Sequence, residues 1–393
     1  MVNKRSFLTM AAFVSLALNG MILTSLGTSL PAIQKFLAID IKQAGMLMAL
    51  LQAGLTVFSL LAGILSDHFR CERILVTGCL LLCFSTISFC TSDLYGMNIP
   101  LVFFMGAGIG CILSGSNTLL IRLYPARKGT ILNIHHVFFG LGSLLGPLFI
   151  GYLISRGNLW REGFTAQAIL LSALGLFFFF SGGEKPRQQS RSSYFQEVAR
   201  LFRDREFKAI LLVNGLTMGS QVTILLLGVT FLIEEKMCTL PVASATLSTF
   251  SLFIMLGRLL CSRLILKFSH GAIIMVLLWL QLLLLIMAWF FQGGFALIAL
   301  CLSGFSFSGI YPTVLSLTGI LFPRVSGSAL GIISTLGSLG AMVLCWTTGY
   351  VASLTDMGNG FIVMILASFA ALIIFQIHHK SLHFRERKTT NNF

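Results

Sequence analysis

Charge is scarce in this sequence, and its sign is uneven. Asp, Glu, Lys and Arg together make up only 10% of the 393 residues, whereas ordinary globular chains carry about 25%. Hydrophobic residues make up 56%. Because apolar runs of about twenty residues follow one another along the chain, a soluble multidomain protein is excluded and the sequence predicts an integral membrane protein.

Acidic residues are particularly few, at 13 against 27 basic ones. Each lies in a predicted loop or near the end of a predicted membrane span, so none is expected at the middle of the membrane. A buried carboxylate is the usual carrier of protons through a membrane protein. Proton coupling through a carboxylate is therefore not supported by the sequence.

Motifs that would indicate an enzyme or a nucleotide-driven pump are missing. The chain has no G-x-x-x-x-G-K segment, and its nine cysteines include no C-x-x-C pair. These absences exclude ATP hydrolysis by this chain and give no sign of a disulfide framework or a zinc site. We therefore expect no catalytic residue, no bound metal and no cofactor.

The apolar segments number twelve and predict an all-α integral membrane fold of twelve transmembrane helices. They fall into two sets of six, which predicts an N-terminal half at 1–181, a cytoplasmic central loop at 182–206, a C-terminal half at 207–379 and a cytoplasmic tail at 380–393. The tail is basic and is expected to be disordered. In the central loop, Phe195, Val198 and Phe202 suit either a short amphipathic helix or an extended linker. The spans lie at roughly 6–30, 42–66, 73–91, 98–122, 129–155, 162–181, 207–233, 241–265, 272–291, 294–320, 326–352 and 358–378.

An internal duplication supports the division into halves. Residues 106–155 align without a gap on residues 304–353, and 13 of the 50 pairs are identical. Both copies contain an aromatic-Pro pair followed four residues later by Gly, as Tyr124-Pro125 and Phe322-Pro323 show. Each copy reads as a helix, a turn and a second helix. Repeated halves of this kind are typical of transporters.

The basic residues indicate the orientation in the membrane. On the predicted spans, 22 of the 27 Lys and Arg lie on the side of the termini and the central loop. Because positive charge accumulates on cytoplasmic loops, both termini are expected in the cytoplasm, and the bacterial inner (plasma) membrane is the expected location. This distribution accounts for the net charge of +14, so no nucleic-acid partner is predicted.

Twelve spans in two related halves resemble the major facilitator superfamily. The segment from Gly63 to Arg73 resembles that family's signature loop, although Cys71 and Glu72 interrupt its usual basic run. Other segments are similar to the fucose/glucose permease group, and Gly142-x-x-x-Gly146-Pro147 also overlaps the pattern of drug antiporters. The segments similar to the permeases are Asn117, His136-x-x-Phe-Gly140-Leu-Gly142-x-x-x-Gly146-Pro147, Gly257-Arg258…Ser262-Arg263 and Gly309-Ile310-Tyr311-Pro312-Thr313.

The resemblance implies a set of gating residues. Asp67 would lie against the N-terminus of the eleventh span, where the helix dipole favours a carboxylate, and would hold the inner gate shut. Arg73 or Arg122 would be its ion partner, and Arg258 of the second half is the fourth residue assigned to the gate. A solvated loop carboxylate is the alternative for Asp67.

Two histidines, His135 and His136, lie well inside the apolar spans. Because imidazole titrates near neutral pH, either could carry a proton or bind solute. Hydrogen bonding between helices is the alternative for both.

Neutral polar residues in spans 1, 4, 7 and 10 form the predicted solute-binding set. The resemblance places these spans around a central cavity, and amides and hydroxyls suit a neutral or weakly polar solute. Helix–helix hydrogen bonding is the alternative for each residue. The set is Asn19, Asn117, Asn214, Gln221 and Tyr311.

The sequence therefore predicts a secondary transporter that moves one small solute, a sugar or related metabolite, by alternating access. The partners expected are that solute, the lipid bilayer and, if transport is coupled, a proton or sodium ion. A monomer is expected from the resemblance. The alternatives are an efflux transporter for amphipathic compounds, favoured by the Phe-rich spans, and a non-transporting membrane receptor on the same fold.

Overall fold

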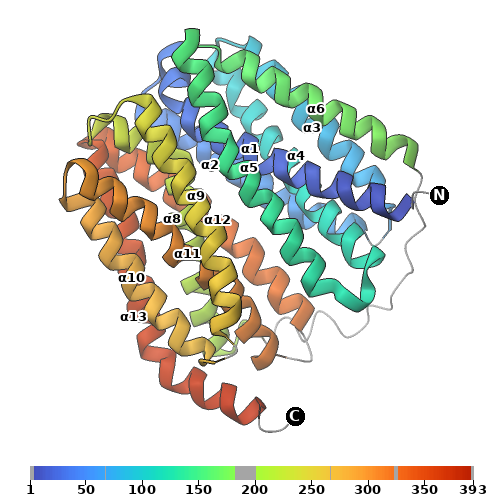
Figure 1. Cartoon of the computed structure of the whole chain (residues 1–393), viewed down its shortest axis with the longest axis vertical. Helices are drawn as coiled ribbons and strands as arrows, with labels where there is room; N and C mark the ends of the chain where they lie inside the picture. Colours follow the sequence, from blue (N-terminus) through green and yellow to red (C-terminus); the bar gives the residue numbers. More distant parts are fainter. Residues whose placement is uncertain (1–3, 67, 182–200, 266, 323–325, 391–393) are drawn as a thin grey trace. The chain divides into compact units, whose positions relative to one another are not determined.

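The chain is described by a computed structural model that covers residues 4–66, 68–181, 201–265, 267–322 and 326–390. Over these residues the protein is built from helices joined by short connections (Figure 1). Twelve of the described helices are long and apolar enough to cross a membrane. The predicted all-helical fold with twelve spans is confirmed.

The helices begin and end close to the predicted spans. In the first half they are α1 (Lys4–Leu37), α2 (Ile41–Ser66), α3 (Cys71–Thr91), α4 (Tyr95–Leu123), the 3₁₀ turn η1 (Pro125–Arg127), α5 (Lys128–Gly157) and α6 (Trp160–Ser181). In the second half they are α8 (Arg205–Glu234), α9 (Leu240–Leu264), α10 (His270–Phe290), α11 (Gly293–Leu321), α12 (Ser326–Leu354) and α13 (Met357–Thr390).

The C-terminal tail differs from the prediction. It was expected to be disordered, but α13 continues without a break to Thr390. The extension is held to the protein, since Leu382 is buried in a hydrophobic cluster and Arg385 pairs with two carboxylates. The segment around Phe195 and Val198, for which either a short amphipathic helix or an extended linker was expected, lies outside the described residues.

The first compact unit comprises Met1–Gln189 together with Leu225–Ser248. Its most extensive helix pairs are α2 with α4 and α1 with α5, and α3 packs on both α4 and α6. Glycines allow these helices to approach closely. A Cβ at Gly106 of α4 would fall on the main-chain oxygen of Leu51 in α2, so no larger residue fits between these backbones.

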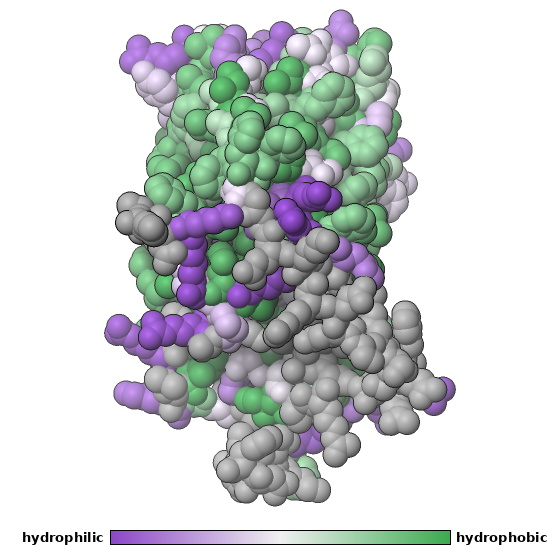
Figure 2. Space-filling model, turned by 90° about the vertical axis from the view of Figure 1, so that its right-hand side faces the viewer, coloured by the Kyte–Doolittle hydropathy of each residue, from purple (hydrophilic) through white to green (hydrophobic). Residues whose placement is uncertain are grey.

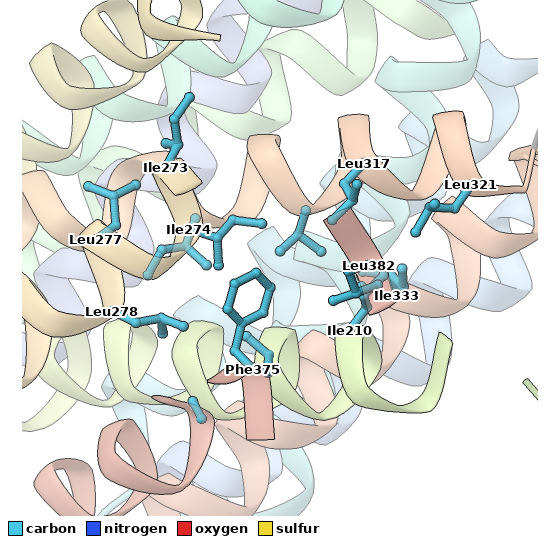
Figure 3. Packing of buried hydrophobic residues seen from close by; sticks show 14 of the residues in the cluster. Ile210, Ile273, Ile274, Leu277, Leu278, Leu317, Leu321, Ile333, Phe375 and Leu382 are labelled. Atoms are coloured by element: carbon cyan, nitrogen blue, oxygen red, sulfur yellow. The ribbon is translucent and has the colours of Figure 1, made fainter. Parts of the chain in front are cut away.

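The second compact unit comprises Ser190–Ile224 and Thr249–Phe393. Here α10 packs on α11 and α13, and α12 packs on α13. Side chains from several helices meet in one cluster around the ring of Phe375 (Figure 3). Residues labelled there are Ile210, Ile273, Ile274, Leu277, Leu278, Leu317, Leu321, Ile333, Phe375 and Leu382.

Hydrophobic side chains also cover much of the outer surface. Figure 2 shows a face with a broad hydrophobic area and with hydrophilic residues at its upper end and in its lower half. Large residues such as Phe84, Phe180 and Phe295 are strongly exposed. A soluble protein rarely exposes so much apolar surface, whereas a bilayer requires it.

Candidate functional site

Asn19 occupies the middle of α1 and is completely buried. Its amide nitrogen donates to the main-chain oxygen of Ile109 in α4, at 3.2 Å. Its amide oxygen is buried without a partner. If the Asn19 amide were rotated by 180°, its oxygen would face the main-chain oxygen of Ile109, and two acceptors cannot bond. The amide oxygen of Asn19 is therefore the atom without a partner. Asn19 therefore joins two helices and keeps one buried acceptor available.

His135 joins three helices of the first unit. It is fully buried on α5, with Nδ1 3.0 Å from Oδ1 of Asn117 in α4 and Nε2 3.1 Å from the main-chain oxygen of Ala12 in α1. The Ala12 carbonyl can only accept, so Nε2 carries a hydrogen. A neutral ring then requires Asn117 to present its amide NH₂ to Nδ1, whereas a charged ring donates to the amide oxygen. The protonation of His135 and the orientation of the Asn117 amide are thus linked.

His136, the adjacent residue on α5, is only half-buried. The two imidazole rings are 5.9 Å apart between centroids. Of the two histidines, His136 is therefore the more exposed. His135 instead fits the helix–helix alternative considered for it.

Asn214 on α8 of the second unit hydrogen-bonds in a similar way to Asn19, although its partner helix, α12, corresponds in the repeat to α5 and not to α4. It is completely buried, and its amide nitrogen donates to the main-chain oxygen of Ile333 in α12, at 2.9 Å. Its amide oxygen is again buried without a partner. Gln221, seven residues further along α8 and on the same face, is also buried.

Tyr311 of α11 and Arg258 of α9 form a second polar group in this unit. The Tyr311 hydroxyl is 2.9 Å from that of Ser334 in α12. Arg258 is half-buried and lies near the Tyr311 side chain. Nothing in the sequence pointed to Ser334, because a serine in an apolar helix usually bonds its own backbone.

The predicted gate is only partly described. Asp67 lies outside the described residues, so its role stays a prediction. Arg122 donates to the main-chain oxygen of Ser66 at the end of α2, at 2.6 Å, and thereby joins α4 to the signature loop. Arg73 is exposed in the first turn of α3. Both arginines are thus near the loop that contains Asp67.

The duplicated glycines make equivalent contacts in the two units. A Cβ at Gly142 of α5 would fall on the Ala17 carbonyl of α1, and one at Gly340 of α12 would fall on the Gly215 carbonyl of α8. Both members of each contact are related by the same 198-residue offset as the sequence repeat. Where a glycine meets a main-chain carbonyl in this way, the two helix backbones can pack closely without side chains interlocking between them.

Metal binding finds no support in the described part of the chain, where no group of three or more His, Cys, Asp or Glu could hold an ion. The polar groups are amides, hydroxyls, imidazoles and the guanidinium of Arg258, which bind through hydrogen bonds. Such groups suit reversible binding of an organic solute.

Comparison with known proteins agrees with this description. Residues 12–345 match the Major Facilitator Superfamily. The chain belongs to this superfamily. Its resemblance to the fucose/glucose permease group is not established by these matches. Members of the superfamily are transporters, and the chain is a transporter of small solutes rather than an enzyme.

Individual relatives in the superfamily have different solutes. The chain is 24% identical to the cis,cis-muconate transport protein of Acinetobacter baylyi, over 92% of this chain and 91% of that protein. A structure of a mutant of the nucleoside transporter NupG matches with a TM-score of 0.79 and 15% identity, covering 95% of this chain and 99% of that one. A D-xylose-proton symporter matches with a TM-score of 0.74 and 15% identity, covering 93% and 96%. At such identities the structures show the fold alone.

Proposed function

We propose that this transporter moves a small neutral solute with several hydroxyl groups, such as a sugar or a nucleoside, by alternating access. The observation that carries the proposal is the pair of unpaired amide oxygens, on Asn19 and Asn214. Each is fully buried on the first helix of its half, α1 or α8. An unpaired buried acceptor is costly, and a solute hydroxyl would satisfy it.

The charge of the described spans supports a neutral solute. The ten acidic residues that the structure describes all lie in loops or near helix ends. A carboxylate solute offers only acceptors, so it would not satisfy the oxygens of Asn19 and Asn214. The nucleoside transporter and the D-xylose-proton symporter among the structural neighbours act on hydroxylated solutes. Asn117, Gln221 and Tyr311 complete the proposed binding set.

A second candidate solute is a small organic acid. The Acinetobacter baylyi relative, which matches over nearly its whole length, is named for cis,cis-muconate, a dicarboxylate. In this chain, the half-buried Arg258 beside Tyr311 offers a cation that could bind a carboxylate. In the hydroxylated-solute proposal, Arg258 instead belongs to the gate with Asp67, Arg73 and Arg122.

Coupling to protons is proposed through the histidines rather than through a carboxylate. His136 is the more exposed of the two, and the charge of His135 determines which way the Asn117 amide faces. The proton named in the description of the xylose symporter supports this choice over sodium. We further propose that the protein is monomeric in a bacterial inner membrane, with both termini cytoplasmic, as the Lys and Arg distribution favours.

A thermal-shift screen of the purified protein tests the solute class. A ligand of the folded state raises the melting temperature by mass action. We expect stabilisation by pentoses, hexoses or nucleosides, and loss of that response in Asn19→Leu and Asn214→Leu. The control is Asn98→Leu, because Asn98 is also buried with an unpaired amide oxygen but lies in the first turn of α4.

The other outcomes identify the alternatives. Stabilisation by cis,cis-muconate alone, lost in Arg258→Gln, would replace the sugar proposal with the organic-acid one. Broad stabilisation by unrelated amphipathic compounds would favour efflux.

A further inference from the structure

The aromatic residue of the repeated aromatic-Pro pair ends its helix in the same way in both units. Tyr124 ends α4 with φ −127° and ψ 60°, and Phe322 ends α11 with φ −127° and ψ 57°. Each amide donates to the carbonyl four residues earlier, at 2.9 Å. We call Tyr124 and Phe322 the two elbows. Each stands at the end of the first duplicated helix, before the second.

An arginine near the start of the chain covers the first elbow. The guanidinium carbon of Arg5 lies 4.1 Å from the centroid of the Tyr124 ring. Thr9, one turn further along α1, places its hydroxyl 3.0 Å from that of Tyr124. The N-terminal turn of α1 is thereby attached to the end of α4.

An arginine near the end of the chain covers the second elbow. The guanidinium carbon of Arg385, on the extension of α13, lies 5.3 Å from the centroid of the Phe322 ring. Phe207 packs edge-on against the same ring, with centroids 5.4 Å apart. Phe207 is the 198-residue counterpart of Thr9, so the contact from α1 or α8 is also repeated.

The second contact also has an ionic part. Nη1 of Arg385 lies 2.9 Å from Oδ2 of Asp204 and 2.9 Å from Oε2 of Glu206. The hydroxyl of Ser381 donates to Oε1 of Glu206 at 2.6 Å. Asp204 also accepts from the amide of Phe207 and so caps α8. Arg385 therefore fixes the start of α8 and the end of α11 together.

We propose that Arg5 and Arg385 are positioning residues of the transport cycle, each clamping the elbow of its own half. Helices α4 and α5, and α11 and α12, must keep a fixed angle at their elbow for each half to move as one body. Two unrelated segments of the chain, its beginning and its end, supply the same cation to the same repeated ring. The proposal holds for a hydroxylated solute and for an organic acid alike.

Hydrogen–deuterium exchange of the full-length protein without solute tests the clamps. In Arg385→Ala, amides at 318–322 and 205–211 should exchange roughly fivefold faster, as expected for losing about 1 kcal/mol of local stability. Amides at 118–124 should be unchanged. In Arg5→Ala, amides at 118–124 should exchange faster, and amides at 318–322 and 205–211 should be unchanged. Lys380→Ala, an exposed cation on the same extension, should change neither elbow.

Two further readouts separate clamping from a general structural role. Arg385→Lys keeps a cation that can pair with both carboxylates but loses the planar guanidinium that lies over the Phe322 ring. Compared with Arg385→Ala, it should therefore slow amide exchange at 205–211 again, while amides at 318–322 should still exchange fast. Raising the salt concentration should loosen the Phe322 elbow more than the Tyr124 elbow, because salt screens ion pairs. Unchanged exchange at both elbows in the alanine variants, or equal loosening of both elbows in each variant, would overturn the proposal.

Discussion

Single glycines determine how closely the helices of each half approach. Gly142 and Gly340 occupy equivalent positions of the repeat, and each faces a bare backbone carbonyl, of Ala17 or of Gly215. The 198-residue repeat relates these two glycines to each other. The partners could not be predicted, because a one-dimensional repeat does not say which helix lies opposite.

Gly142→Leu should lower the free energy of unfolding by about 1–3 kcal/mol, since its side chain has no room beside α1. The melting temperature in detergent measures the loss. Gly319→Ala is the control, because a Cβ at this helical glycine would meet no atom within 4 Å beyond its chain neighbours and the backbone of its own helix. That variant should be neutral or more stable by about 0.5–1 kcal/mol. An equal drop in melting temperature in both variants would contradict the close approach of α5 to α1 at Gly142.

The two histidines should behave differently when replaced. His135→Leu removes contacts to Asn117 and Ala12, so it should cost about 1–3 kcal/mol of stability. His136→Gln should leave the melting temperature nearly unchanged and flatten the pH dependence of uptake. The measurement is solute uptake by the original protein and by His136→Gln from pH 5 to pH 8. An unaltered profile in His136→Gln would remove this residue as the proton carrier.

At the scale of helices, several acidic residues cap the elements that follow them. Asp40, Asp204 and Asp356 directly precede α2, α8 and α13, and each accepts a hydrogen bond from the main-chain amide three residues later. The sequence placed every acid in a loop or near a span end but did not assign these three a structural role. A carboxylate there satisfies free amides and suits the helix dipole.

Asp356→Ala should lower the free energy of unfolding by about 1 kcal/mol, because the amide of Asn359 loses its acceptor. Asp356→Ser keeps an acceptor and should retain most of the stability. Thermal unfolding of the two variants side by side gives the comparison. Identical melting temperatures for the alanine and serine variants would contradict the capping role.

Helix ends were the least predictable part of the fold. Hydropathy located all twelve spans, because a bilayer imposes both length and composition on each one. It could not locate the end of α13, since the last residues are polar and their order depends on Asp204 and Glu206, far away in the sequence. Tertiary contacts of this kind leave no periodic signal.

The candidate site was predictable in its residue types and less so in their pairing. Asn19 and Asn214 were recognised as polar groups inside apolar spans. That both use the nitrogen for a neighbouring helix and leave the oxygen unpaired emerges only from the structure. The contacts of Arg5 and Arg385 were missed because basic residues near the ends of a membrane protein ordinarily report only orientation.

For the molecule as a whole, the proposed orientation makes Cys238 a useful reporter. It lies half-buried in the connection between α8 and α9, on the side opposite to the proposed cytoplasmic termini. Burial raises the pKa of its thiol, and the neighbouring Lys236 lowers it by less. A raised pKa means little thiolate at pH 7, so labelling should be slow there and accelerate as the pH rises.

In intact cells, a membrane-impermeant maleimide should label a variant whose sole cysteine is Cys238, and labelling should be faster at pH 8.5 than at pH 7. A cysteine-free background with Lys380→Cys should become labelled only after the cells are opened. The reverse pattern would place the termini outside the cell and contradict the proposed orientation.

Solute flux into proteoliposomes tests the central claim most directly. We expect vesicles with the protein to take up a radiolabelled hydroxylated solute, chosen by the thermal-shift screen, faster than empty vesicles. Asn19→Leu and Asn214→Leu should lose this flux, while Asn98→Leu should retain it. If cis,cis-muconate enters and every neutral hydroxylated solute fails, the unpaired amide oxygens do not select the solute and the proposed substrate class is wrong.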